Sequence, residues 1–341
     1  MDRYRPSLGM RVTVALLHLL CSLAMLADEP IRHEIIPYEG GEFSFQIDGI
    51  EAVRFHSRPH APRPFFFPVT GPSGALLTRM GHPGAPNHDH HRSVWFGHES
   101  VAGENFWTDQ TDTIIRQKSW RSIYESETQS RFATILGWYG SDQFELLEQT
   151  LIVEHTSTPD GGYTIELQST FTPPLTRSYT ELGKTNFGFL AIRMARSVSA
   201  HFGGGRLSNA NGLEGESAIF GKQATWVDYS GPVSSGTGAE RKLVNEGITC
   251  FDHPENPRYP TRWHVRDDGW MGPSFCFEEG YVIRPREPLI LRYLLHIHSG
   301  DVNPEFASKL ADRFAQSPRL DVTPDERPHR AFSIHREEEG P

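Results

Sequence analysis

The segment NHDHHRSVWFGH, residues 87–98, concentrates four of the chain's 17 histidines within twelve positions. Arg92, Trp95 and Phe96 are interspersed among them. Histidine exchanges protons near neutral pH and is the commonest metal ligand, while arginine binds oxyanions and carboxylates. Isolated histidines in a β protein are usually surface or hydrogen-bonded core residues, but four of them beside an arginine and two aromatic rings favour a functional pocket.

The spacing of these histidines decides which of them can act together. In a single strand, His88, His90 and His98 would share one face and His91 would lie on the other, because successive side chains alternate. Prolines and a glycine in residues 83–87 indicate a loop instead, followed by a strand with the sequence SVWFGHE. A loop that leads into a strand lets all four side chains converge on one site, and the preceding His82 can fold back onto it.

Proton transfer is the first chemistry that fits this segment. We expect His91 or His98 to act as general acid or base, because imidazole is suited to that role near neutral pH. Arg92 is the expected charge clamp for an oxyanion or a carboxylate. His90 is a further catalytic candidate.

A metal centre is the alternative chemistry. A His-x-His pair on a strand edge is a recurrent ligand spacing, so His88, His90 and His98 would hold a divalent metal, with His253 or His296 completing the set. The chain matches no known zinc spacing and offers no paired cysteines. The sequence thus specifies no cofactor, and a divalent metal stays open.

Further aromatic and polar residues are candidates for a substrate-binding wall. Aromatic side chains follow the histidine segment, and residues 251–270 form a polar, proline-rich stretch that is typical of a functional loop. Core packing and a salt-bridged surface loop are the alternative interpretations. His296 and His298 form a second His-x-His pair on one face of an otherwise apolar strand. The candidate substrate-binding residues are Trp95, Asn105, Trp107, His253, Arg258, His264, Arg266 and His296.

The elements that must position these residues are predominantly strands. The chain contains 31 glycines, 25 prolines and 11% aromatic residues, which favours a turn-rich β protein. Short runs of alternating apolar residues recur along it, and TPDGG at residues 158–162 indicates a hairpin. Helical periodicity is convincing only in NPEFASKLADRFAQ, residues 303–316. We therefore predict an all-β fold, a large antiparallel β-sandwich with one C-terminal helix.

The ends of the chain differ from its centre. Residues 1–27 combine a positive start with an apolar run, which predicts a secretory signal peptide and a secreted or periplasmic protein. Residues 28–317 are expected to form a single β-sandwich domain, and the Pro-, Arg- and Glu-rich residues 318–341 a disordered tail. Cys250 and Cys276 can pair after export or remain buried thiols.

Charge and hydropathy exclude some partners. The net charge of −10, without a basic run, argues against nucleic acid binding. After the signal peptide, no apolar run is long enough for a transmembrane helix. The expected partner is a small molecule or an oligosaccharide.

Long segments of the chain resemble a secreted bacterial family that is abundant in planctomycetes. The family is catalogued as a domain of unknown function and is also labelled "methane oxygenase PmoA" or PmoA-like. The resemblance runs from about Arg63 to Phe314. The segments that carry it are NHDHHRSVWFGHES, LGKTNFGFLAIRMARSVS, HFGGGRLSNANGLEGESAIFGKQATWVDYSGP, FDHPENPRYPTRWHVRDDGWMGPSFC and LRYLLHIHSGD.

The resemblance implies a sandwich of the galactose-mutarotase type, often encoded beside sugar-related oxidoreductases and hydrolases. Relatives often carry a glutamate where Asn211 stands, and Glu214 or Glu216 can substitute for it. The methane-oxygenase label does not imply methane oxidation or copper, because a particulate methane monooxygenase subunit consists of several apolar membrane helices.

Together these observations predict a secreted enzyme that acts on a carbohydrate or modified sugar by histidine-based acid/base catalysis. Epimerase, lyase and hydrolase activities fit equally. A His-ligated metalloenzyme is one alternative. A non-catalytic carbohydrate-binding module is the other, although such modules bind on flat aromatic platforms and need no convergent proton carriers.

Overall fold

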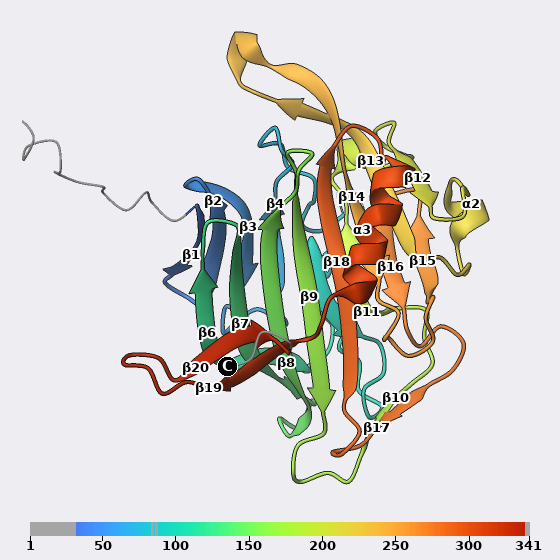
Figure 1. The fold of residues 1–341 in the computed structure, drawn as a ribbon. Coiled ribbons are helices and arrows are strands. Elements are labelled where there is room, and N and C mark those ends of the chain that lie inside the picture. The colour runs from blue at the N-terminus through green and yellow to red at the C-terminus, as the bar shows by residue number, and fades with distance from the viewer. Residues whose placement is uncertain (1–31, 83–84, 86–87, 338–341) are drawn as a thin grey trace, which may run out of the picture. The chain divides into compact units, whose positions relative to one another are not determined.

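Two eight-stranded antiparallel sheets build the protein (Figure 1). The computed structural model describes residues 32–82, 85 and 88–337. The chain from Arg32 onward forms one compact unit. The predicted signal peptide, residues 1–27, lies outside the described residues. The sheets confirm the predicted all-β, antiparallel fold class.

The first sheet has the strand order β1-β2-β3-β4-β5-β11-β16-β15. Its central strands come from distant parts of the sequence, since β5 pairs with β11 and β11 with β16. The strands are β1 (His33–Tyr38), β2 (Glu42–Ile47), β3 (Ile50–His56), β4 (Phe65–Val69), β5 (Val94–His98), β11 (Gly188–Arg193), β15 (Arg262–Arg266) and β16 (Trp270–Ser274).

The second sheet has the order β12-β13-β14-β18-β9-β8-β7-β6. The predicted TPDGG turn joins β8 to β9, and their pairing runs up to Ser157 opposite Tyr163. The strands are β6 (Ile114–Glu125), β7 (Gln129–Tyr139), β8 (Glu145–Ser157), β9 (Tyr163–Thr172), β12 (Arg206–Asn209), β13 (Trp226–Ser235), β14 (Lys242–Asp252) and β18 (Leu289–Ser299). A small sheet pairs β10 (Thr180–Leu182) with β17 (Tyr281–Ile283).

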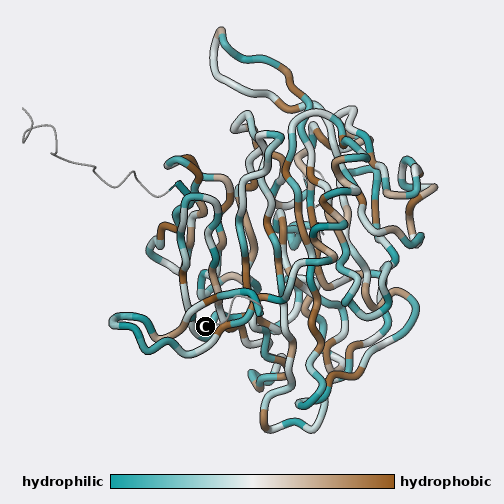
Figure 2. The backbone as a smooth tube through the Cα atoms, in the orientation of Figure 1, coloured by the Kyte–Doolittle hydropathy of each residue, from teal (hydrophilic) through white to brown (hydrophobic). Residues whose placement is uncertain are grey.

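Side chains from both sheets share one large apolar core. Hydrophobic and hydrophilic residues alternate along many strands (Figure 2). The central strands of the first sheet are buried on both faces. In β11, Leu190 and Ile192 belong to the core, whereas Ala191 belongs to a separate aromatic cluster on the outer face. By the same alternation, Arg193 lies on that outer face.

The predicted C-terminal helix is confirmed as α3 (Pro304–Gln316). The side chain of Asn303 caps it by accepting hydrogen bonds from the backbone N–H groups of Glu305 and Phe306. The helix buries Ala307 and Phe314 against aromatic and aliphatic residues of the second sheet. The described part of the chain also contains the short helical segments η2 (Arg196–Val198), α2 (Glu216–Ile219) and η3 (Gly238–Glu240).

The expectation of a disordered tail is wrong for residues 320–336. These residues form a hairpin of β19 (Leu320–Pro324) and β20 (Phe332–Arg336). Leu320 and Ile334 pack against Ala133 and Ile152 of the second sheet. The apolar face of this hairpin is too small to stand out in a sequence rich in Pro, Arg and Glu. The hairpin is stabilised by packing its apolar side chains against the second sheet.

Cys250 and Cys276 are both buried free thiols. Burial raises the pKa of Cys276 to about 12 and that of Cys250 well above its ordinary range. The two residues therefore serve as small apolar core residues. Among the described residues, no helix is long and apolar enough to cross a membrane.

The imidazole of His155 in β8 makes the fold sensitive to acid. It is fully buried, and neither ring nitrogen has a hydrogen-bond partner among the described residues. Burial, reinforced by His33, lowers its pKa from 6.5 to about 3. Between pH 6.5 and about pH 3, His155 binds a proton in the unfolded chain but not in the folded chain. The free energy of unfolding therefore decreases as the pH falls through this range.

We expect the substitution His155→Phe to reduce this loss of stability. Between pH 6.5 and about pH 3, the unfolding free energy of both proteins should fall with pH. The fall should be steeper for the wild type than for the variant, by up to about 1.4 kcal/mol per pH unit. Urea unfolding of both proteins at several pH values measures the difference. Identical pH slopes for the two proteins would contradict the assignment.

Candidate functional site

A cavity of about 340 Å³ lies on the outer face of the first sheet. This volume falls in the usual range of small-molecule sites. Strands β11, β15 and β16 supply part of its wall, and the loops before β5, after β5 and before β11 supply the rest. The lining residues are His88, His90, His91, Trp107, Phe187, Arg193, His264, Arg266, Asp268 and Trp270.

Three tryptophans support the cavity. The ring of Trp95 in β5 lies 5.2 Å from that of Trp270 in β16 and 5.7 Å from that of Trp107. Trp107 also contacts Phe187, at 5.1 Å between ring centroids. This cluster exists because β5, β11 and β16 are neighbours and place alternate side chains outside the core.

Residues 88–93 form a turn that leads into β5, whereas the predicted loop at residues 83–87 lies outside the described residues apart from Ala85. His91 is the centre of the group, with its ring 4.5 Å from that of His90, 5.1 Å from that of His88 and 4.9 Å from that of Trp270. The backbone carbonyl of His91 accepts a hydrogen bond from the N–H of Gly81 at 2.7 Å, which closes the loop.

His264 reaches the same cavity from β15. Its ring lies 4.9 Å from that of Phe187 and 5.8 Å from that of Trp270. Nδ1 of His264 lies 2.8 Å from the carbonyl oxygen of Asn186. In the neutral ring Nδ1 therefore donates to this carbonyl, and Nε2 is the basic nitrogen.

Both principal imidazoles are neutral at neutral pH. Burial lowers the pKa of His264 to about 4. Burial also holds the pKa of His91 far below its ordinary range, and the neighbouring His90 and Arg193 lower it further. Each ring can therefore accept a proton, and the energetic cost of charging it is set by its desolvation.

An ion pair between a buried arginine and a partly exposed carboxylate underlies the cavity. Arg193 is 0% exposed, and its Nη1 lies 2.6 Å from Oδ1 of Asp268. Nε2 of His82 lies 3.3 Å from Oδ2 of the same carboxylate. Burial alone would raise the pKa of Asp268, but its hydrogen bond and ion pair with Arg193 hold the pKa below its ordinary value. Asp268 is therefore ionised.

The structure brings six of the candidate residues together around this cavity: His88, His90, His91, Trp107, His264 and Arg266. Two others support them. Trp95 packs behind the cavity in the tryptophan cluster. Oδ1 of Asn105 accepts hydrogen bonds from the backbone N–H groups of Trp107 and Thr108, which fixes the turn that carries the Trp107 ring.

Arg92 does not line the cavity, contrary to its expected role as a charge clamp. It forms an ion pair with Asp109, which also binds the buried Arg63 at 2.9 Å. Nη1 of Arg63 donates to the carbonyl oxygen of His90 at 3.3 Å. This pair of arginines around one carboxylate therefore holds the histidine loop in place.

His98 lies apart from the other histidines of the segment. It is 0% exposed, stacks on Phe189 at 4.8 Å and places Nε2 3.1 Å from the carbonyl oxygen of Gly183. Alternation along β5 puts His98 on the core side, opposite to Trp95. The prediction that His98 shares a site with His91 is therefore wrong.

The remaining candidates make structural contacts elsewhere. Nε2 of His253 lies 2.9 Å from the carbonyl oxygen of Phe314 in α3. His296 belongs to the second sheet and lies 3.1 Å from Asp160. Arg258 donates to backbone carbonyls at the turn before β17, with Nη2 2.7 Å from Gly280. His253, Arg258 and His296 therefore do not line the histidine-lined cavity.

The set of metal ligands expected from spacing does not assemble. His88 and His90 lie in the loop, with ring centroids 5.9 Å apart, whereas His98 points into the core. Within the part of the chain that the structure describes, no group of three or more His, Cys, Asp or Glu side chains is arranged to hold a metal ion.

Four residues line the cavity without being among those predicted from the sequence: Phe187, Arg193, Asp268 and Trp270. Arg193 carries the clearest signal, since it ends the apolar run FGFLAIR, whose strand is buried on both faces. Asp268 and Trp270 lie in the polar stretch 251–270 but are separated from the histidine loop by more than 170 residues of sequence. Only the strand order of the sheet brings them together.

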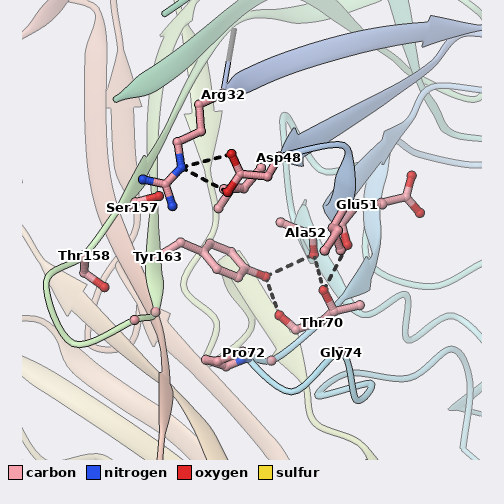
Figure 3. Close-up of a pocket in the computed structure, with 15 residues that line it drawn as sticks. Arg32, Asp48, Glu51, Ala52, Thr70, Pro72, Gly74, Ser157, Thr158 and Tyr163 are labelled. Atoms are coloured by element: carbon pink, nitrogen blue, oxygen red, sulfur yellow. Dashed lines mark hydrogen bonds and ion pairs between the residues drawn. The ribbon is translucent and has the colours of Figure 1, made fainter. Parts of the chain in front are cut away.

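A second cavity, of about 280 Å³, lies near the turn between β2 and β3 (Figure 3). Arg32 and Asp48 form an exposed ion pair there at 3.1 Å. The hydroxyl of Tyr163 lies 2.6 Å from the carbonyl oxygen of Thr70 and 3.0 Å from that of Ala52. The principal polar groups of this cavity are thus satisfied within the protein.

Comparisons with known proteins place the chain in a family. The chain is similar to the crystal structure of a GalM/aldose epimerase homologue from C. elegans, with 9% sequence identity, a TM-score of 0.33, and coverage of 80% of this chain and 99% of that chain. No curated protein matches the sequence. The model of a family of unknown function, DUF6807, matches residues 42–312, so the chain belongs to the DUF6807 family.

Proposed function

We propose that this protein is a secreted or periplasmic enzyme that transfers protons on a carbohydrate or modified sugar bound in the histidine-lined cavity. The observation that carries the proposal is the convergence of His91 and His264 on one tryptophan-walled cavity. Their ring centroids lie 4.9 and 5.8 Å from that of Trp270. The N-terminal signal-like sequence supports the location.

The walls of the cavity suit a molecule with both apolar and hydroxylated surfaces. Trp107 and Trp270 provide aromatic surface, which packs against the C–H face of a sugar ring. Arg266 and Asp268 place charged groups on the same cavity. Aromatic rings interspersed with charged and titratable side chains can both pack against a small polar ligand and orient it.

The two imidazoles give the site a means of moving protons. Nε2 of His264 is free to act as a base because Nδ1 is committed to the carbonyl of Asn186. Nδ1 of His91 is buried and has no hydrogen-bond partner among the described residues. Epimerisation, elimination and hydrolysis each require one group that removes a proton and one that returns it. Both rings enter the reaction neutral, so each can remove a proton as a base, and the imidazolium that this forms is the acid that returns the proton. We therefore assign these roles to His91 and His264.

Glutamine substitutions at these two positions test the assignment. His91→Gln and His264→Gln should each lower the rate of sugar conversion about 10²–10⁴-fold, the usual contribution of a general acid or base. Proton NMR in D₂O on a panel of neutral, oxidised and acidic saccharides detects isotope exchange, epimerisation and cleavage together. His60→Gln, at an exposed position outside the cavity, is the matched control and should retain full activity.

Wild-type activity in both cavity variants would overturn the catalytic assignment. Binding of a saccharide without any conversion would instead show a carbohydrate-binding module. Absence of both binding and conversion across the panel would overturn the proposed function itself.

The depressed pKa of His264 predicts an unusual pH profile. A base acts only when it is deprotonated, and this imidazole loses its proton at about pH 4. The kcat/KM of the wild type should therefore stay level from neutral pH downward and fall only as the pH approaches about 4. A fall centred near about 6.5, the ordinary histidine value, would contradict the role of His264. Far-UV circular dichroism at each pH separates loss of activity from unfolding.

A further inference from the structure

Arg193 has hydrogen-bonding capacity that the protein leaves unused. Its side chain is fully buried and lines the cavity. Nη1 binds Asp268, whereas Nε and Nη2 have no hydrogen-bond partner among the described residues. These two nitrogens form one edge of the planar guanidinium group. That edge presents two parallel N–H donors, the arrangement that binds two oxygens of one anion.

The charges around this edge leave an excess of positive charge. Arg79 and Arg193 lie near a single carboxylate, that of Asp268, and the exposed Arg196 adds a further positive charge near Arg79. Nε of Arg79 donates to the carbonyl oxygen of Met194 and Nη2 to that of Asp268, so Arg79 contributes its charge but binds no second carboxylate. Burial and Arg193 lower the pKa of Arg79 to about 10, which leaves it protonated at neutral pH.

The other charged or titratable groups at the cavity do not remove this excess. Arg266 is balanced by Glu216 at 2.7 Å. Burial lowers the pKa of His88, His91 and His264, so these imidazoles add no negative charge and little positive charge at neutral pH. A desolvated, uncompensated cation is costly in a protein interior, and a bound anion offsets that cost.

A second donor lies nearby. Nε1 of Trp270 is buried without a hydrogen-bond partner among the described residues, and Trp270 lines the same cavity as Arg193. Indole N–H is a donor only, so it can bind a hydroxyl or carboxylate oxygen but cannot be satisfied by a cation. Two cavity residues therefore carry buried donors that lack acceptors.

We propose that the sugar bound in this cavity is acidic, and that Nε and Nη2 of Arg193 bind its carboxylate. This inference rests on the proposed carbohydrate function and adds the class of substrate, a uronic or other sugar acid. A carboxylate carries one negative charge at neutral pH, which offsets positive charge around Arg193, and its two oxygens match the two parallel donors. A phosphate monoester carries nearly two charges, so its transfer from water into this cavity costs more.

Anion binding would also act on the proton-transfer groups. The charge of Arg193 contributes to the low pKa of His91 and of His88. A carboxylate on Arg193 neutralises that charge and makes both imidazoles more basic when substrate is present. The carbon next to a neutralised carboxylate also loses a proton more readily, because the resulting negative charge is spread onto oxygens held by the guanidinium group.

The first experiment measures selectivity of the wild-type protein by calorimetry or NMR titration. Glucuronate and galacturonate, as methyl glycosides and as disaccharides, are compared with the corresponding neutral sugars and with sugar 6-phosphates. We expect the uronates to bind at least about tenfold more tightly than the neutral sugars, as expected for a charge-assisted pair of hydrogen bonds. The phosphates should bind more weakly than the uronates.

The second experiment changes the proposed anion site. Arg193→Gln should abolish the preference for uronates over neutral sugars, and Arg193→Lys should weaken uronate binding at least about tenfold because lysine lacks the planar pair of donors. Arg258→Gln, outside the cavity, is the matched control and should keep the preference. Thermal unfolding of each variant verifies that it is folded. The wild-type selectivity tests the proposal even if both variants fail to fold.

The outcomes distinguish this inference from the proposed function. Equal binding of neutral and acidic sugars by the wild type would overturn the inference and leave the carbohydrate function standing. Tighter binding of phosphates than of uronates would also overturn it. Arg193-dependent binding of simple carboxylates such as benzoate, without binding of any saccharide, would support the anion site and overturn the carbohydrate function. Unchanged uronate preference in Arg193→Gln would show that another group binds the anion.

Discussion

The candidate site depends on the double burial of the central strands of the first sheet. Side chains of β5 and β11 alternate between the core shared with the second sheet and a separate cluster on the outer face. Only a second apolar layer on the outer face makes such strands stable, and the tryptophans supply that layer. The cavity is the place where this outer layer meets the histidine loop, so its position follows from the way the sheet is covered.

Within this apolar surround, the buried guanidinium group of Arg193 is electrostatically expensive. Its desolvation offsets much of its attraction to the partly exposed Asp268, and such pairs are weak evidence for stability. The pair also lies next to imidazoles whose pKa values burial has already lowered. Desolvated donors and neutral bases gathered around one cavity support the proposal that a ligand binds there. The cavity near the turn between β2 and β3, whose principal polar groups bind within the protein, lacks this character.

Local patterns in the sequence predicted much of the fold. The hairpin between β8 and β9 and the helix α3 are specified by short-range features, a Gly-rich turn in one case and a capped apolar stripe in the other. The C-terminal hairpin was not predictable in the same way. Its stability depends on contacts of Leu320 and Ile334 with strands of the second sheet that lie far away in the sequence.

The sequence by itself determined that histidines are concentrated in a loop before a strand and that polar residues gather in the stretch 251–270. Tertiary structure decided which of them meet. His98 was separated from its neighbours because the alternation of β5 turns it into the core, where it stacks on Phe189. His264 joined them because β15 and β16 lie beside β11 in the same sheet. Arg193 became part of the site for the same physical reason, since strand order, which no local pattern encodes, fixes the neighbours of each outward-facing side chain.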